Sequence, residues 1–415
     1  MFSLKNEQKR IKQMLLIIEI IFTAAALISV FKYGNSLLMG SLQKFDNDDV
    51  KYIRSAWNLL DNKIISYENI KEPTVYIMPG LTYVLSFFMF IFGKFGGITA
   101  FKVFQVILQS ASIYLIFLIG RKVFSSRVGI TACIIDALYA AELFAVNTIF
   151  MECIFKFLLL LLIYISIYAV ENKSLKLYLA GGIIWGISCF FRPTAAVYPA
   201  IILIMWIKNK YKFSDMFKYT AIVLGIFCLI MAPWWVRNYK VFNMFIPFTK
   251  SSGNPFLQGT FINYDQSAGW GVPYIAGKNS FENNQNELNA GFQRLKIYAK
   301  KEPLKYILWY TAGKTFYFWA GAFYWKSIFH IPIPCVYVFH IIILLFGISG
   351  IINEIKKNSI SVFLFSTLIL FTAVYLPFYT FSRYSYPLMP LVIIFAAAAL
   401  NKLLPDKKIL RKEIC

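Results

Sequence analysis

Acidic side chains gather at two places in the sequence where a helix is expected to begin. Asp48 and Asp49 open an amphipathic segment, with Asp46 just before them, and Glu152 opens a long apolar segment. Close carboxylates repel one another, so they share a proton, bind a cation or pair with a base, and such grouping can hold a general base near working pH. The same spacing also suits an acidic helix N-terminus that the helix dipole favours.

Three arginines lie at the ends of apolar segments. Arg192 is in CFFRPTAAVYP, Arg237 in APWWVRNY and Arg383 in YTFSRYSYPLMP. Each can serve as an anchor whose charge reaches the membrane surface. If they line one vestibule, they supply forked cations that suit a phosphate group. Carboxylates and arginines at one face therefore predict an enzyme whose substrate is a lipid phosphate.

The composition indicates a membrane protein. Of the 415 residues, 59% are hydrophobic and 15% are charged, whereas soluble domains carry about 25% charged residues. Apolar runs of about 17 to 22 residues, long enough to cross a bilayer, recur from Met14 to Leu400. A water-soluble enzyme and a nucleic-acid partner are thereby excluded, and the net charge of +22 orients helices in the membrane.

The apolar segments predict an all-α, polytopic transmembrane bundle of about 10–12 spans, with helices at the outer interface and one long external loop. Two shorter segments, 79–95 and 304–325, are expected at the outer interface or as re-entrant segments. If both cross the membrane, the number of spans is twelve. The ten predicted spans are 14–31, 98–120, 129–147, 153–170, 177–191, 194–207, 219–235, 331–350, 360–378 and 385–401.

Basic residues predict how the bundle is oriented in the plasma membrane. With the N-terminus inside, the inner segments hold 20 basic and 6 acidic residues, so both termini are expected in the cytoplasm. Three parts follow from this topology. Residues 1–235 form a catalytic transmembrane module whose outer loop is 32–97, residues 236–330 form an external segment, and residues 331–415 form the last helices and a basic cytoplasmic tail.

Several short motifs occur in a fixed order along the chain. The first is a pair of acids, a tyrosine three residues after the second acid and an alanine four residues further on. An Arg-Pro pair, a PW..RN element and a final Arg-Tyr with two prolines follow. Their residues are Asp48, Asp49, Tyr52 and Ala56, then Arg192 and Pro193, then Pro233, Trp234, Arg237 and Asn238, then Arg383, Tyr384, Pro387 and Pro390.

This ordered set resembles the polyprenyl-phosphate-sugar-dependent membrane glycosyltransferases of C-type fold, which include protein O-mannosyltransferase-like and aminoarabinose-transferase-like enzymes. The resemblance implies that Asp48 is catalytic, with Asp49 in support and Glu152 as the second acid. Many relatives carry glutamate where this chain has Asp49, and Asp46 is an additional candidate. The implied substrate-binding residues are Tyr52, Arg192, Arg237, Asn238, Arg383 and Tyr384.

The implied reaction is an inverting transfer of a hexose or pentose from a polyprenyl-phosphate sugar to a glycan, lipid or protein acceptor of the cell envelope, at the outer face. A Mg²⁺ or Mn²⁺ ion bridging Asp48, Asp49 and Glu152 is left open, because oxygen ligands suit these ions but a lysine could meet the same charge. The alternative class is a lipid-linked oligosaccharide flippase or a polysaccharide polymerase or ligase. A flippase would need polar residues through the depth of the bilayer, whereas here they gather at one face.

Overall fold

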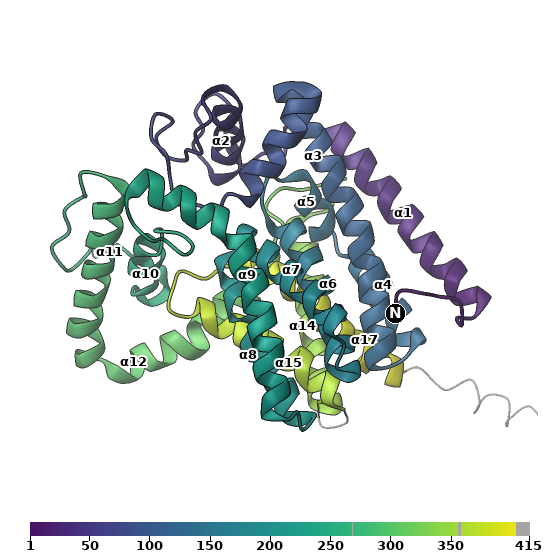
Figure 1. Ribbon diagram of the computed structural model, residues 1–415. Coiled ribbons are helices and arrows are strands. Elements are labelled where there is room, and N and C mark those ends of the chain that lie inside the picture. Colours follow the sequence, from purple (N-terminus) through teal and green to yellow (C-terminus); the bar gives the residue numbers. More distant parts are fainter. Residues whose placement is uncertain (268, 356–357, 404–415) are drawn as a thin grey trace, which may run out of the picture.

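The computed structural model describes residues 1–267, 269–355 and 358–403, and its regular elements there are helices (Figure 1). The predicted all-α fold is thereby confirmed. The basic tail expected at 404–415 lies outside the described residues.

In chain order the helices are α1 (Lys9–Tyr33), α2 (Asp48–Asn62), α3 (Gly80–Val123), α4 (Ser126–Leu138), α5 (Ala141–Asn147), α6 (Glu152–Asn172), α7 (Leu175–Phe191), η1 (Pro193–Val197), α8 (Tyr198–Lys208), α9 (Phe213–Phe242), α10 (Gly253–Gly259), η2 (Ile262–Tyr264), α11 (Ser280–Arg294), η3 (Leu295–Ala299), α12 (Pro303–Leu308), η4 (Trp309–Gly313), α13 (Lys314–Trp319), α14 (Ile333–Glu354), α15 (Ser359–Tyr375), α16 (Ser382–Ser385), η5 (Tyr386–Leu388) and α17 (Met389–Leu403).

Six stretches of helix in the described part of the chain are long and apolar enough to cross a membrane. They are α1, α3, α6, α9, α14 and the run Ser382–Leu403, and α4 with α5, bent by 60°, makes a seventh if the pair is one span. The other three predicted spans coincide with shorter apolar helices of 10–17 residues, namely α7, η1 with α8, and α15. A straight crossing needs about 20 residues, with a lower limit of about 17, so α7 and α15 are at that limit with 17 residues each.

The helices differ in how deeply they are buried. α6 and the run Ser382–Leu403 lie mostly inside the protein, whereas α1, α9 and α14 expose most of their apolar length. Ile21, Leu229 and Leu345 are large apolar side chains exposed on these three outer helices. Apolar surface of this extent fits contact with lipid, and we conclude that the chain is a multi-pass membrane protein.

The long helix α3 is broken at Gly93, where φ is 76° and ψ is 166°. The chain folds back there so tightly that a Cβ on Gly97 would lie 2.4 Å from the Cα of Met89, which explains the glycines at the bend. The break separates 79–95 from 98–120, as predicted. The first arm packs through Leu81 and Leu85 against Val50 and Ile53 of α2, at the upper end of the bundle in Figure 1.

Residues 236–330, the segment predicted to be external, were expected to be a long loop, yet much of the segment is helical. Helices α10 to α12 form an arm beside the bundle (Figure 1), and Leu257, Phe261 and Ala290 form its small core. The polar run 283–286 lies within α11, whose start is capped by Asn279 through the backbone amides of Phe281 and Glu282. The many polar residues of α11 suggested a loop, because only a narrow face of this helix is apolar. The other ambiguous segment, 304–325, consists mainly of the short helices α12, η4 and α13, which have six, five and six residues. None of the three is among the helices that are long and apolar enough to cross a membrane.

Candidate active site

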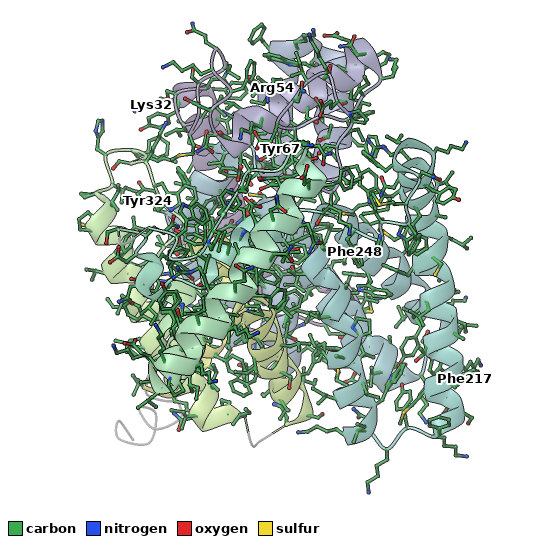
Figure 2. The ribbon with its side chains drawn as sticks, turned by 90° about the vertical axis from the view of Figure 1, so that its left-hand side faces the viewer. Lys32, Arg54, Tyr67, Phe217, Phe248 and Tyr324 are labelled. Atoms are coloured by element: carbon green, nitrogen blue, oxygen red, sulfur yellow. The ribbon has the colours of Figure 1, made fainter. Side chains whose placement is uncertain are left out.

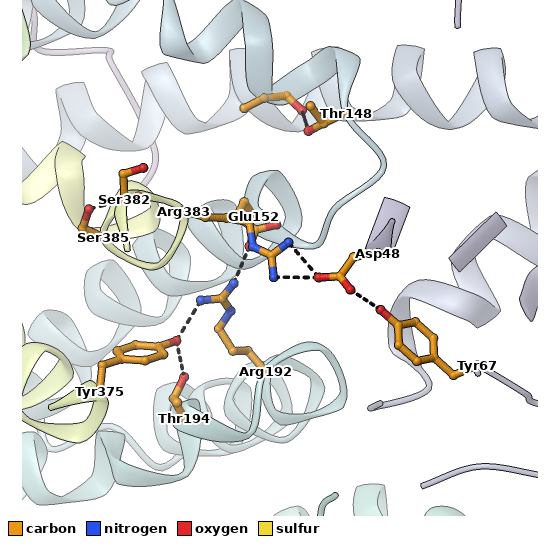
Figure 3. Close-up of polar contacts among 11 residues, drawn as sticks. Asp48, Tyr67, Thr148, Glu152, Arg192, Thr194, Tyr375, Ser382, Arg383 and Ser385 are labelled. Carbon is orange, nitrogen blue, oxygen red and sulfur yellow. Dashed lines mark hydrogen bonds and ion pairs between the residues drawn. The ribbon is translucent and has the colours of Figure 1, made fainter. Parts of the chain in front are cut away.

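Most of the predicted acids and arginines meet at one end of the bundle (Figure 3). Asp48 is the first residue of α2 and Glu152 is the first residue of α6. Arg192 caps the C-terminal end of α7, and Arg383 lies in the short helix α16. Helix termini that are far apart in the sequence thus bring two carboxylates and two guanidinium groups into one cluster.

The four side chains form a chain of alternating charge. Both Nη atoms of Arg383 donate to Oδ2 of Asp48 at 3.2 Å, and its Nε lies 3.3 Å from Oε1 of Glu152. Nη2 of Arg192 donates to the same Glu152 oxygen at 2.5 Å, and Nη1 donates to the Tyr375 hydroxyl at 2.7 Å. The formal charges of these residues cancel, so the cluster is satisfied electrostatically when nothing is bound.

The two carboxylates of the cluster, Asp48 and Glu152, differ in their exposure to solvent. The Asp48 side chain is 44% exposed, whereas that of Glu152 is 2% exposed. A molecule from outside the protein can therefore reach Asp48 but not Glu152. Glu152 instead fixes Arg192 and Arg383 relative to each other.

Aromatic rings surround the two arginines. The Arg383 guanidinium lies 4.6 Å from the centre of the Phe150 ring, and that of Arg192 lies 5.1 Å from the Tyr384 ring. Tyr384 in turn stacks on Tyr375 at 4.8 Å. Ring faces favour a desolvated guanidinium, so the predicted residue Tyr384 acts as a support for both cations.

The arginines have N–H groups that make no hydrogen bond within the cluster. The Nε atom of Arg192 is buried and makes no hydrogen bond among the described residues, whereas the buried Nε of Arg383 has only its ion-pair contact with Glu152 at 3.3 Å. A buried donor without a partner is costly. An anion with several oxygens that enters the cluster would satisfy donors of this kind.

Tyr67 is a site residue that the sequence motifs did not reveal. Its hydroxyl donates to Oδ1 of Asp48 at 2.6 Å. Burial and the Asp48 charge hold its pKa well above the usual tyrosine value, so it remains a donor at neutral pH. The predicted residue Tyr52 is buried against the Tyr67 ring, with centroids 5.4 Å apart. Tyr52 therefore supports Tyr67. Tyr67 itself lies in the loop between α2 and α3, which carries none of the motifs, and so no signal in the sequence indicated it.

Asp49 points away from the cluster. Its carboxylate accepts hydrogen bonds from the backbone amides of Met39 at 2.6 Å, Gly40 at 3.2 Å and Val50 at 2.9 Å. Burial raises the pKa of Asp49, and the three amide donors oppose that shift. Asp49 thus ties the chain at residues 39–40 to the start of α2. Asp46 has a similar role, because its Oδ1 accepts from the Ser41 amide at 2.8 Å.

The three acids considered for a divalent cation do not fit a shared ion. Asp49 is turned to backbone amides, and Glu152 is directed at two guanidinium groups. Only Asp48 has exposed surface of any size, and it pairs with Arg383. Across the described ranges, no three His, Cys, Asp or Glu side chains are grouped as metal ligands.

Arg237 and Asn238 lie apart from the cluster. Nη1 of Arg237 donates to the carbonyl of Thr74 at 2.8 Å and to Oδ1 of Asn238 at 3.0 Å. Asn238 donates to the carbonyl of Ile246 at 3.1 Å. Within the described part of the chain, Arg237 makes no contact with Arg192 or Arg383. The pair instead fixes the segment around Thr74 against the end of α9.

A second group of buried charges lies one turn further along α6. Nζ of Lys156 is 2.7 Å from Glu142 and 3.1 Å from Asp136, and the side chains of all three are fully buried. The Tyr386 hydroxyl donates to Glu142, and Gln109 donates to that hydroxyl at 3.1 Å. Tyr386 follows Arg383 by three residues. This group therefore holds the turn that carries Arg383 against the helix that carries Glu152.

We compared the chain with a family model, with protein sequences and with solved structures. The family model described as dolichyl-phosphate-mannose-protein mannosyltransferase matches residues 71–236. That range includes Glu152 and Arg192 but not Asp48, Arg237 or Arg383. No curated protein sequence matches the chain significantly.

Among solved structures, the apo oligosaccharyltransferase of Archaeoglobus fulgidus matches with a TM-score of 0.56 and 14% identity, over 96% of this chain and 51% of that one. Its complex with an inhibitory peptide and a dolichol-phosphate matches at 0.54 with 16% identity, over 96% and 51%. ArnT from Cupriavidus metallidurans bound to undecaprenyl phosphate matches at 0.43 with 14% identity, over 92% and 76%.

The chain spans about half the length of the archaeal enzyme that it resembles. The likeness at this identity concerns the fold. The resemblance predicted from the ordered motifs is confirmed within residues 71–236, where the mannosyltransferase family model matches, and the solved structures show that the fold is shared.

Proposed function

We propose that this protein is a membrane glycosyltransferase that moves a hexose or pentose from a polyprenyl-phosphate donor to an acceptor hydroxyl. One observation carries the proposal. An exposed carboxylate, Asp48, is hydrogen-bonded to Arg383, which joins a second arginine, Arg192, through a buried glutamate. A base and a phosphate-binding pair are the two parts that such a transfer needs.

In the proposed reaction, Asp48 takes the proton of the acceptor hydroxyl while the acceptor oxygen attacks the anomeric carbon of the donor sugar. The bond between that carbon and the phosphate oxygen breaks, and its electron pair stays on the phosphate. The products are the glycosylated acceptor and the polyprenyl phosphate. Because the nucleophile enters opposite the leaving group, the anomeric configuration is inverted.

Arg192 and Arg383 are proposed to stabilise the negative charge that grows on the leaving phosphate. Their guanidinium groups suit phosphate oxygens, and the surrounding rings and Glu152 keep them in one arrangement before the donor arrives. Glu152 is therefore a positioning residue. Tyr67 is a second positioning residue, because it holds one oxygen of Asp48.

Donor binding is also proposed to release the base. With no donor bound, both Nη atoms of Arg383 donate to Asp48. The phosphodiester monoanion of the donor would take up these N–H groups in competition with Oδ2 of Asp48. That oxygen would then be free to accept the acceptor's proton, so the donor binds before the acceptor is activated.

A reconstituted assay tests the function. The purified protein in nanodiscs receives synthetic polyprenyl-phosphate hexoses and pentoses together with neutral saccharide, lipid and peptide acceptors. We expect glycosylated acceptor and polyprenyl phosphate in equal amounts. A flippase would carry the donor across a proteoliposome membrane with its sugar intact, and this result would replace the proposal. A polymerase or ligase would act only on a donor that already carries a longer glycan.

A further inference from the structure

A polar cavity lies beside the cluster of acids and arginines. It has a volume of about 610 Å³ and lies between residues 67–76 and the external segment, at residue 254 and residues 276–287. Tyr67, labelled at the upper end of the molecule in Figure 2, belongs to its wall. The same tyrosine donates to Asp48, so one side chain separates the cavity from the exposed carboxylate.

The cavity wall carries an unusually buried acid. Glu287 is 7% exposed, and its Oε1 accepts hydrogen bonds from the side-chain amides of Asn254 and Asn283, both at 3.2 Å. Burial raises the pKa of Glu287, and the two amide donors oppose the shift. Among the described residues it has no cationic partner, so its negative charge is met only by amide groups.

The rest of the wall combines amides, hydroxyls and one aromatic pair. Asn279, Ser280 and Asn284 come from the external arm, and Tyr76 stacks on Tyr67 with centroids 5.5 Å apart. Carboxylates and amides that exchange hydrogen bonds in both directions, beside ring faces, suit a ligand that carries many hydroxyl groups.

The charged residues of the cavity wall restrict which class of ligand can bind there. Its carboxylates are Glu68, Glu72 and Glu287, and Lys51 pairs with Glu68 at 2.8 Å. The wall itself contains no Lys or Arg. An anionic ligand would be repelled here, in contrast with the neighbouring cluster, whose arginines favour a phosphate.

We propose that this cavity is the acceptor site and that the acceptor is a neutral saccharide. The inference rests on the glycosyl transfer proposed above and names its acceptor class. Arg237 acts on the same site, because it holds the carbonyl of Thr74, a wall residue, at 2.8 Å. The site thus has one half that contains two arginines and another half that is lined by carboxylates without Lys or Arg, with Asp48 and Tyr67 between them.

The test uses the full-length protein in nanodiscs and three variants. Glu287→Gln removes the buried charge at constant size, and Asn283→Ala removes an amide of the wall. Gln285→Ala is the control, because this exposed residue of the same helix pairs with Asn289 and does not line the cavity. Binding of neutral hexose disaccharides without donor is followed by saturation-transfer NMR, and transfer is measured with neutral disaccharides, uronic-acid disaccharides and serine- or threonine-containing peptides.

We expect Glu287→Gln and Asn283→Ala to raise the KM for the neutral saccharide about tenfold or more, since each removes a hydrogen bond to the ligand or to a charged group. The kcat and the KM for the donor should stay as in Gln285→Ala. Unchanged acceptor KM in both variants, or preferred transfer to peptides or uronic-acid saccharides, would overturn the assignment. If no donor is cleaved but Glu287→Gln still abolishes saccharide binding, the proposed transfer fails while the saccharide site stands. If saccharide binding is absent from the wild type, the site fails whatever the outcome of transfer.

Discussion

Replacing Asp48 by asparagine separates its part in proton transfer from its part in the fold. Asparagine has nearly the size of aspartate and can exchange hydrogen bonds with Tyr67, but it cannot take a proton from an acceptor. A positioned base contributes about 10²–10⁴-fold to a rate, which corresponds to about 2.7–5.4 kcal/mol of transition-state stabilisation. We expect turnover to fall within that range.

The effect on stability should be much smaller. The Asp48 side chain is 44% exposed, and asparagine in its place can still accept hydrogen bonds from Tyr67 and Arg383. The Arg383 side chain is only 12% exposed, but it keeps Glu152 as a partner at 3.3 Å. We therefore expect the loss of rate to exceed the loss of stability in free energy, and donor affinity should be kept or improved because the arginine loses a competing carboxylate.

The measurement is single-turnover transfer from a synthetic polyprenyl-phosphate sugar, with donor binding and thermal unfolding followed on the same samples. Asp46→Asn is the matched control, since Asp46 lies two residues before Asp48 and accepts from the Ser41 amide. Near-normal transfer by Asp48→Asn would refute the assignment. It would move the base elsewhere if Asp46→Asn, or Glu152→Gln with intact donor binding, were inactive instead.

Three further changes test other parts of the structure. Asp49→Ala removes the acceptor of one buried and two partly buried backbone amides. A buried donor without an acceptor costs about 1–3 kcal/mol, so thermal unfolding should occur at a lower temperature while kcat of the folded fraction stays normal; a normal melting temperature would contradict this. Arg237→Lys should raise the acceptor KM and leave donor affinity unchanged, because the guanidinium holds the Thr74 carbonyl; loss of donor affinity instead would make Arg237 a phosphate ligand, as the sequence motif first suggested. For the topology, cysteine labelling from outside should mark Asn283→Cys but not Asn358→Cys, and labelling of the second would reverse the predicted orientation.

The cluster of charges could be predicted in large part from the sequence. Glu152, Arg192 and Arg383 each stand at the end of an apolar segment, and Asp48 opens the amphipathic segment of the predicted first outer loop. A bundle of antiparallel spans brings such positions to the same face, and packing then decides which of the charges meet. Asp49 was grouped with Asp48 because the two are neighbours in sequence, but successive helix positions point about 100° apart, and this angle turns Asp49 towards the Met39 and Gly40 amides.

Contacts between irregular segments could not be predicted in this way. Tyr67 lies in a loop, and its contact with Asp48 depends on how residues 63–79 fold over α2. Arg237 was predicted beside the other arginines because it also ends a span, yet the position of a side chain around its helix decides its partners, and Arg237 faces Thr74. Helix α11 was missed because its residues are mostly polar, and the four consecutive Asn and Gln residues at 283–286 were interpreted as part of a loop.

If the protein is the transferase proposed above, the positions of these side chains limit hydrolysis of its donor. Hydrolysis would require a water molecule to be activated by Asp48 while the sugar phosphate is bound. Asp48 is held by Arg383 before the donor arrives, and Tyr67 continues to hold its other oxygen afterwards. Because Tyr67 also forms part of the cavity wall, a saccharide that fills the cavity would press against the residue that orients the base. In this scheme the donor frees the carboxylate and the acceptor aligns it, so that proton transfer is fastest only when both halves of the site are occupied.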